Sequence, residues 1–338
     1  MEQAKKTANT NSPSWIEIVS RYNFSDPVRS WWQIINSVVP YLLLWAAMIW
    51  SLKVSYFLTL FLSVFAAGFL VRIFIIFHDC GHGSFFRSKL LSRIVGIITG
   101  IMTFTPYHKW THEHKEHHAT VGNLDKRGVG DVKTLTIEEF LKLSPWKRFV
   151  YRFYRHPLFL FGLAPFLVFV FVNRLPKKFT SSKEHIYLHL TNLALVVTII
   201  LMMWLIGWKA YLLIQLPVLY IASVHGVWLF YVQHQYENVV WARADEWNYK
   251  DIALEGSSYF KLPKVLQWFT GNIGFHHIHH LSPKIPNYKL PECYNENIVF
   301  QEVKPVTFFS SLRSLKLRLW DEERKKLVGF KALRYYSR

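Results

Sequence analysis

Histidines at helical spacing are the residues of this chain that could do chemistry together. Among 16 His, three clusters within residues 78–82, 114–118 and 276–280 follow the patterns HxxxH, HxxHH and HxxHH. Residues three or four apart on a helix share one face, at about 5–6 Å from each other, so these imidazoles can converge on a metal. The eight histidines at the pattern positions are His78, His82, His114, His117, His118, His276, His279 and His280. One such pattern arises easily by chance, whereas three in one chain indicate a metal site.

The number of histidines indicates which metal chemistry this would be. Zinc sites use three or four protein ligands, so eight are too many for one zinc ion. Imidazole also suits iron and copper, and eight or nine nitrogens can hold two irons with positions left open for oxygen. A haem would need single histidines that face each other, which paired clusters do not provide. We therefore predict a di-metal centre that activates oxygen.

The elements that position these clusters are predicted to be membrane helices. The 338 residues are 51% hydrophobic and only 18% charged, whereas soluble domains carry about 25% charged residues. A span needs roughly 17–25 apolar residues, and four runs fit, at about residues 36–52, 54–77, 186–207 and 211–232. Lys53 and the pair Trp208-Lys209 join them as two tight hairpins. No signal peptide is expected at the start, and two cysteines cannot make a disulfide framework.

Two shorter apolar runs test this topology. Residues 94–105 are too few to cross, and residues 158–172 are marginal, since a span needs roughly 20 residues. If the second run crossed the membrane, the third histidine cluster would reach the face opposite to the other two. We therefore predict that both runs are interfacial or buried segments.

The distribution of positive charge predicts the orientation. All but three of the 40 Lys and Arg residues lie in segments that four crossings place on one face together with both termini; the exceptions are Lys53, Arg72 and Lys209. By the positive-inside rule this face is cytoplasmic, which places both termini and the histidine clusters in the cytoplasm at the cell membrane. The net charge of +18 also suits nucleic-acid binding, but these basic residues flank spans and form no separate domain.

The predicted fold is an all-α integral membrane protein, with four transmembrane helices in two hairpins and a cytoplasmic helical cap that carries the histidines. We expect a cytoplasmic N-terminal segment over residues 1–37, a catalytic domain over residues 38–310 and a basic amphipathic segment over residues 311–338. In the last segment Leu312, Leu315 and Leu319 have helical spacing. That helix would lie on the membrane or pack onto the cap.

Beyond the spacing, the chain resembles the membrane fatty acid desaturases over roughly residues 30–330. Residues 78–86, 110–120 and 271–288 match the histidine boxes of that family in order and spacing. Residues 230–237 (FYVQHQYE) resemble the family segment that carries an additional ligand, here His234. Residues 122–128 and 255–258 resemble bacterial acyl-lipid desaturases of the delta-5 type.

The resemblance implies an enzyme that inserts a cis double bond into acyl chains of membrane lipids, with delta-5 as the suggested position. It implies two iron ions, O2 as co-substrate, and two electrons from a ferredoxin- or flavodoxin-type donor. The eight cluster histidines and His234 would be the iron ligands. Removal of hydrogen from unactivated methylenes needs such a centre, and an apolar tunnel under the boxes would set the double-bond position by its depth.

The other histidines and nearby acids have supporting roles in this interpretation. His112 and His277 lie inside clusters but off the pattern, so we expect structural roles; His225 in the fourth span either lines a cavity or is a hydrogen-bonded core residue. Interfacial positions are expected for His108, His156, His185 and His189. Metal-bound imidazoles usually donate their other N–H to an acceptor, and the acids near enough are Asp79, Glu113, Glu116, Asp125, Asp131 and Glu237, of which Asp79 is favoured. Cys80 is expected to pack.

Two other functions stay open on the sequence alone. A hydroxylase on the same di-iron scaffold would insert oxygen into the chain, and the boxes do not exclude it. A divalent-metal transporter would bind its cargo near the bilayer midplane, whereas these clusters lie at one membrane edge. The basic face would attract an acidic ferredoxin or anionic lipid headgroups.

Overall fold

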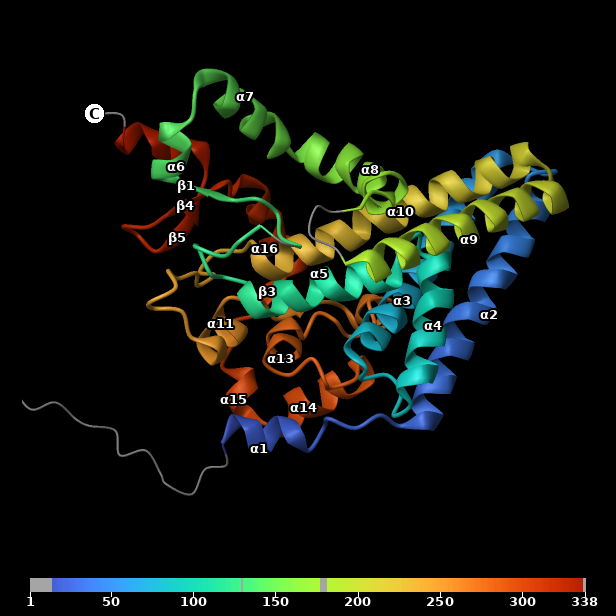
Figure 1. Cartoon of the computed structure of the whole chain (residues 1–338), viewed down its shortest axis with the longest axis horizontal. Helices are drawn as coiled ribbons and strands as arrows, with labels where there is room; N and C mark the ends of the chain where they lie inside the picture. Colours follow the sequence, from blue (N-terminus) through green and yellow to red (C-terminus); the bar gives the residue numbers. More distant parts are fainter. Residues whose placement is uncertain (1–13, 129, 177–180, 337–338) are drawn as a thin grey trace, which may run out of the picture.

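The computed structural model describes residues 14–128, 130–176 and 181–336, and this part of the chain is mainly helical (Figure 1). The α-helices are α1 Trp15–Ser20, α2 Pro27–Ser51, α3 Tyr56–His82, α4 Lys89–Met102, α5 Tyr107–Thr120, α6 Ile137–Lys142, α7 Pro145–Tyr154, α8 Ala164–Val170, α9 Ser182–Ile206, α10 Trp208–His234, α11 Tyr249–Glu255, α12 Lys264–Phe269, α13 His276–Leu281, α14 Leu290–Glu296, α15 Ile298–Gln301 and α16 Phe308–Ser311. The strands are β1 Leu135–Thr136, β2 Phe260–Lys261, β3 Val306–Thr307, β4 Leu319–Asp321 and β5 Lys326–Val328. A π-helix covers Leu158–Leu163, and short 3-10 helices complete the fold.

Four helices, α2, α3, α9 and α10, are long and apolar enough to cross a membrane. They confirm the predicted all-α membrane fold, and each extends a few residues beyond its predicted apolar run. In Figure 1 α9 and α10 run from the centre to the right of the molecule, and α2 rises along its right-hand side. The chain turns between α9 and α10 at Gly207, whose φ of 86° lies in the left-handed region that glycine adopts without steric cost.

Two bent helix pairs correspond to the shorter apolar runs. Helices α4 and α5 meet at 101°, and α7 meets Leu158–Arg174 at 51°; each pair would add a span only if it crossed as one unit. Arg155, before the second run, donates to Gln235 beside the end of α10, and Lys109 on α5 donates to the carbonyl of Leu175 at its end. The two ends of this run therefore contact the end of α10 and helix α5, and the run remains predicted as a segment that does not cross.

The cap, by which we mean the short helices and strands outside the four long helices, contains two small sheets. One has the order β1-β4-β5 and the other pairs β2 with β3. Helix α1 closes the cap from the N-terminal side, because Ile18, Val19 and Tyr22 pack in one cluster with residues of α13 and α14. The described N-terminal segment and the third histidine cluster thus share one end of the molecule.

The C-terminal segment differs from the amphipathic helix that its leucine spacing predicts. It forms a 3-10 helix at Leu312–Lys316, then β4 and β5, and Leu319 of β4 pairs in parallel with Leu135. Leu317 and Leu319 alternate with Lys316 and Arg318, which is the period of a strand. All three residues of β4 are buried, as are Leu317 and Arg318 before it, so strand pairing inside the cap replaces the expected helical stripe.

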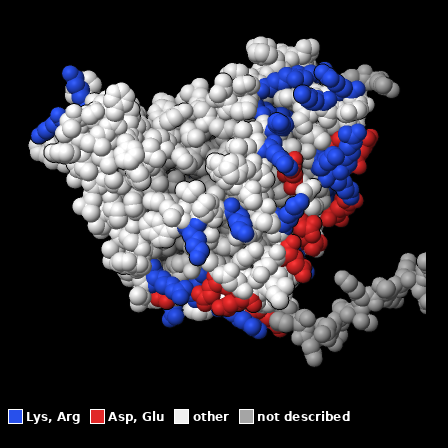
Figure 2. Space-filling model, turned by 180° about the vertical axis from the view of Figure 1, so that it is seen from behind, with Lys and Arg blue, Asp and Glu red and all other residues white. Residues whose placement is uncertain are grey.

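The charged side chains gather at the cap. Figure 2 shows, from behind, Lys, Arg, Asp and Glu concentrated at the right and lower edges, while most of the remaining surface in view carries no charge. The exposed side chains of the long helices include many large apolar residues, such as Phe57, Phe61, Ile200 and Trp204. A broad uncharged apolar surface of this kind is expected where helices face lipid.

Candidate metal centre

Four helices deliver the nine predicted histidines to one place. His78 and His82 end α3, where Gly83 terminates the helix with a φ of 65°. His234 ends α10, and the other two clusters lie on α5 and α13. The two cap-side helices are short, and they carry their histidines on one face because the HxxHH spacing matches the helical repeat.

The nine imidazoles form two groups of potential metal ligands. The five-histidine group comprises His78, His82, His114, His118 and His279, and the four-histidine group comprises His117, His234, His276 and His280. Within each group the candidate ligand atoms all lie within 4.8 Å of one another. The groups are adjacent, because the His118 ring stacks on the His280 ring at a centroid distance of 4.0 Å. The structure thus brings together every histidine that the sequence singled out as a ligand.

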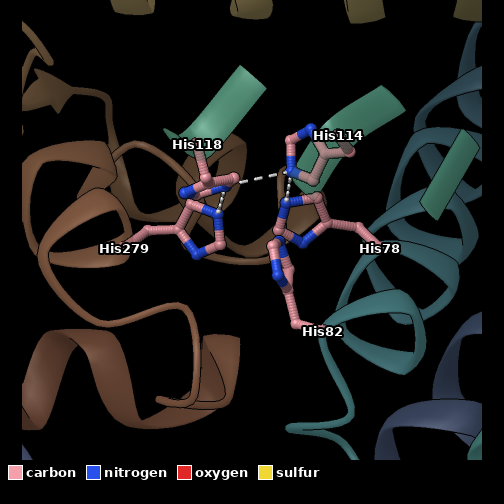
Figure 3. A group of neighbouring side chains, drawn as sticks. All are labelled: His78, His82, His114, His118 and His279. Atoms are coloured by element: carbon pink, nitrogen blue, oxygen red, sulfur yellow. Dashed lines mark hydrogen bonds between the residues drawn. The ribbon is translucent and has the colours of Figure 1, made fainter. Parts of the chain in front are cut away.

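In the five-histidine group the Nε2 atoms face one another (Figure 3). His114 Nε2 lies 3.0 Å from His78 Nε2 and 3.2 Å from His118 Nε2, and His118 Nε2 lies 3.1 Å from His279 Nε2. A neutral imidazole has one N–H and one lone pair, so it cannot donate to several neighbours at once. A cation at the point where these nitrogens converge would satisfy all of them.

In the four-histidine group, the hydrogen bonds of two imidazoles indicate that a cation belongs between them. His117 Nδ1 lies 2.6 Å from Asp131 Oδ1, and His234 Nδ1 lies 3.3 Å from the carbonyl oxygen of Gly256. These oxygens can only accept, so each Nδ1 carries the proton and each Nε2 presents a lone pair. The two Nε2 atoms lie 3.1 Å apart. Two facing lone pairs repel, and a bound metal ion is the arrangement that fits them.

Burial keeps three histidines of the third cluster neutral, and some nitrogens of the grouped histidines have no protein partner among the described residues. Burial is the main cause that holds the pKa values of His276, His279 and His280 well below the usual 6.5, and neighbouring imidazoles lower them further. Both ring nitrogens of His280 and Nε2 of His82 are buried without a hydrogen-bond partner among the described residues. Buried polar atoms are normally satisfied, and neutral imidazole is the form that binds metals.

Two carboxylates orient histidines of the two groups. Asp79 Oδ1 lies 3.0 Å from His78 Nδ1, and Asp79 Oδ2 accepts from the backbone N–H and the side-chain amide of Asn287 at 2.7 and 2.8 Å. Asp131 holds His117 in the same way. Such partners fix the tautomer and the ring orientation of a metal ligand. The sequence favoured Asp79 for this role. Asn287 connects the first histidine box to the loop after the third box, and the sequence pointed to it only by its place next to the third box.

The segments around Gly122 and Glu255 lie near His234 at the end of α10. The carbonyl of Gly256 faces His234, and a Cβ at Gly256 would come within 2.6 Å of the Ile252 carbonyl oxygen. Ser258 donates from its side chain to the Val232 carbonyl and from its backbone to the Gln233 carbonyl. These contacts tie the end of α10 to the strand before α13, so the segments serve to hold two histidine-bearing helices together.

The remaining sequence candidates lie outside the two groups. His112 is 58% exposed and pairs with Glu184, and His277 is buried beside the Phe300 carbonyl, so both are structural. His225 is exposed, with Nδ1 at 2.7 Å from the Ile221 carbonyl oxygen, and it neither lines a described cavity nor sits in the core. Buried Cys80 packs in a cluster of aromatic and aliphatic residues.

The other acids of the sequence prediction take different places. Asp125 and Glu237 form ion pairs at the surface, with Arg243 and Arg313 respectively. Glu116 is exposed. Glu113 lines the cavity described next. Asp79 and Asp131 each contact a grouped histidine through a hydrogen bond.

An apolar cavity of about 270 Å³ leads from the histidines into the membrane part of the molecule. It reaches His78 and His114 of the five-histidine group and His276 of the four-histidine group. Its other walls come mainly from α3, α8 and α10 and include Leu70, Phe74, Val168, Phe169, Leu219, Ala222, Gly226, Leu229 and Phe230. A cavity of this shape and lining suits an alkyl chain. The sequence could not identify these walls, because apolar residues that face lipid and apolar residues that face a cavity look alike.

Comparisons with known proteins agree with this geometry. The sequence profile of the family described as fatty acid desaturase matches residues 51–306. A fatty acid desaturase of Bacillus subtilis is 48% identical over 303 residues, which cover 90% of this chain and 86% of that protein. An sn-1 acyl-lipid omega-3 desaturase (ferredoxin) of Synechocystis is 30% identical over 250 residues, covering 69% of this chain and 62% of the relative.

Family membership, the four apolar helices and the paired histidine groups lead to one assignment. These findings exclude the alternatives of a metal transporter, a soluble protein and a nucleic-acid-binding protein. The chain belongs to the fatty acid desaturase family and is an oxygen-dependent desaturase with an all-helical membrane fold.

Proposed function

We propose that this enzyme introduces a cis double bond into acyl chains of membrane lipids, with delta-5 as the position to test first. The apolar cavity that ends at both histidine groups carries this proposal. The name of the Synechocystis relative, an acyl-lipid desaturase, supports a lipid-bound substrate. Residues 122–128 and 255–258 are the source of the delta-5 assignment, and in the second segment the carbonyl of Gly256 faces His234.

The nine grouped histidines would hold two iron ions, which the facing lone pairs and the unpartnered nitrogens of both groups fit. Bound iron supplies the oxygen chemistry that side chains cannot perform. The protein binds the chain in the apolar cavity, where Phe74 and Phe169 pack ring to edge at 6.2 Å, and keeps bulk water from the reacting methylenes. Asp79 and Asp131 keep the ligand rings in place.

Electron supply and orientation complete the proposal. We propose a ferredoxin- or flavodoxin-type protein as donor, in line with the ferredoxin named for the Synechocystis relative. We also propose that the cap and both termini lie on the cytoplasmic side of the cell membrane, because the Lys and Arg residues concentrate there. Residues 38–310 would form the catalytic domain.

The test is the fatty-acid profile of a bacterial host that expresses the chain, with double bonds located by mass spectrometry. Wild type and His112→Ala should give the same new cis-monoene, because His112 is exposed and outside both groups. His279→Ala should give none, because His279 is a buried member of the five-histidine group. Hydroxy-acyl products would instead support the hydroxylase, and activity in His279→Ala would refute the ligand assignment.

A further inference from the structure

One polar residue after the third histidine cluster, Asn287, has a partner for each of its polar atoms. It begins the short 3-10 helix Asn287–Lys289 and is 1% exposed. Its backbone N–H and its side-chain Nδ2 donate to Asp79 Oδ2 at 2.7 and 2.8 Å. Its side-chain Oδ1 accepts from Gln33 Nε2 at 3.1 Å, and its carbonyl accepts from Asn272 Nδ2 at 3.2 Å. Asn287 is therefore a junction between α2, α3 and the segment before α13.

This junction reaches the five-histidine group through one carboxylate. Asp79 is 1% exposed, and its Oδ1 lies 3.0 Å from His78 Nδ1. The carboxylate can only accept, so Nδ1 carries the proton, and the lone pair of His78 Nε2 points towards His114 Nε2 at 3.0 Å. Both donors of Asn287 bind the other oxygen of Asp79. They therefore fix the rotation of the carboxylate and, through it, the imidazole ring that the carboxylate holds.

Gln33 decides which way the side-chain amide of Asn287 points. Gln33 is 3% exposed and lies on α2, a helix that carries no grouped histidine. Its Nε2 faces Asn287 Oδ1, so the Nδ2 of Asn287 faces Asp79. A reversed amide would set an oxygen against the carboxylate and two N–H donors against each other. The α2 helix thus contributes to the orientation of a carboxylate on α3.

A second set of contacts holds α2 in place at this junction. The hydroxyl of Tyr288, the residue after Asn287, lies 3.0 Å from Ser30 Oγ. Ser30 in turn donates to the carbonyl of Phe85 at 2.7 Å, shortly after the end of α3. Gln33 lies three residues after Ser30 on α2, which places the two side chains on the same face. These hydrogen bonds therefore keep Gln33 opposite Asn287.

We propose that Asn287 and Gln33 are positioning residues of the metal centre, which act on the five-histidine group through Asp79. The inference rests on the proposed function, because it assumes that iron binds there. It assigns both residues to one group, since Asp131 and the Gly256 carbonyl orient the four-histidine group from other elements. A polar contact that merely stabilises the fold would affect both groups alike or neither. The two irons should therefore respond separately to substitutions.

The first measurement is the release of iron, which does not depend on turnover. The iron-loaded protein in detergent would be challenged with a chelator, and the iron that remains bound measured over time. In Asn287→Ala one of the two irons should leave about tenfold faster and the other at the wild-type rate, since outer partners of a metal ligand are worth about 10- to 100-fold in affinity. Gln33→Leu should act in the same direction but more weakly, because Asn287 keeps its contacts with Asp79.

Asn297→Ala is the matched control. The side-chain amide of Asn297 donates to the Cys293 carbonyl at 2.8 Å and to the Tyr22 hydroxyl at 3.1 Å. It thus joins α14 to the segment after α1 through contacts that do not involve Asp79. This variant also loses buried hydrogen bonds beside the third cluster, so we expect a lower melting temperature but release of both irons at the wild-type rate.

The second measurement identifies the affected iron by Mössbauer spectroscopy of protein loaded with isotope-enriched iron. The two groups offer different numbers of histidines, so the two irons should give separate signals. Asn287→Ala should alter one signal and Asp131→Asn the other. Unchanged iron release in Asn287→Ala, faster release of both irons, or a change of the same signal in both variants would overturn the proposal. A wild-type protein that binds no iron would instead refute the proposed function.

Discussion

At the scale of single residues, the outer nitrogen of each histidine decides what the inner nitrogen can bind. Asp131 and the Gly256 carbonyl each accept from an Nδ1–H, and this leaves two Nε2 lone pairs facing each other at 3.1 Å. A carboxylate partner also makes the imidazole a stronger ligand. Asp131 is therefore a positioning residue whose effect is transmitted through His117.

Substitution of Asp131 by Asn tests this role. The amide keeps a polar side chain of the same size but removes the negative charge, so we expect iron affinity or desaturation to fall about 10- to 100-fold. Iron content by metal analysis and product formation in cells would measure it. Asp125→Asn is the matched control, because Asp125 pairs with Arg243 at the surface. Equal activity of Asp131→Asn and wild type would contradict the positioning role.

At the scale of elements, α10 combines substrate and metal functions along its length. Gly226 lines the apolar cavity, and a Cβ there would meet nothing within 4 Å. One turn later Phe230 lines the same cavity, and His234 ends the helix in the four-histidine group. If the acyl chain binds in this cavity, one rigid helix fixes which of its methylene groups lies next to the histidines.

Substitution of Gly226 by Leu tests the apolar cavity as the chain-binding site. The new side chain fills space that the alkyl chain needs, so we expect activity on the normal substrate to fall at least tenfold or to shift to shorter chains. The fatty-acid profile of expressing cells measures both outcomes. His225→Leu places the same leucine side chain at the adjacent exposed position and should leave the profile unchanged. If both variants behave alike, the substrate does not lie in this cavity.

At the scale of the whole molecule, stability depends on pH through the buried third cluster. Burial lowers the pKa of His277 to about 4 and holds the pKa values of His276, His279 and His280 well below 6.5. Below pH 6.5 the unfolded chain therefore binds more protons at these groups than the folded protein does. Stability is fully present above pH 6.5 and is lost as the pH falls, at up to about 1.4 kcal/mol per pH unit for each group.

The melting temperature of the iron-free protein in detergent checks this linkage. We expect it to decrease steadily from pH 7 to pH 5. His277→Gln should reduce the slope, because it removes one buried titrating group, whereas exposed His112→Gln should not. A melting temperature that stays constant over this range would show that the cluster is open to water in the folded protein.

Orientation is also a property of the whole molecule. Lys53 and Lys209 lie at the turns of the two hairpins, and Lys331 lies in the cap. With Lys53→Cys or Lys209→Cys, a membrane-impermeant maleimide should label intact cells, whereas Lys331→Cys should react only after permeabilisation. The two native cysteines are buried and keep the background low. The reverse pattern would place the cap outside the cytoplasm.

The sequence by itself determined the helical membrane fold and the eight cluster histidines, while His234 came from the resemblance of residues 230–237 to a segment of the family. Runs of about 20 apolar residues can satisfy their backbone in lipid only as helices, and the HxxxH and HxxHH spacings already place side chains on one helical face. The strands of the C-terminal segment were missed because three leucines at helical spacing obscured the alternation of Leu317 and Leu319 with basic residues.

Only the tertiary structure decided how the histidines divide into groups of five and four. His117 and His118 are neighbours in the sequence but belong to different groups, because adjacent residues on a helix point about 100° apart and face different partners. The apolar cavity, whose walls come mainly from α3, α8 and α10, likewise depends on contacts between residues far apart in the chain. Local periodicity cannot encode such contacts, since they arise only when the helices pack.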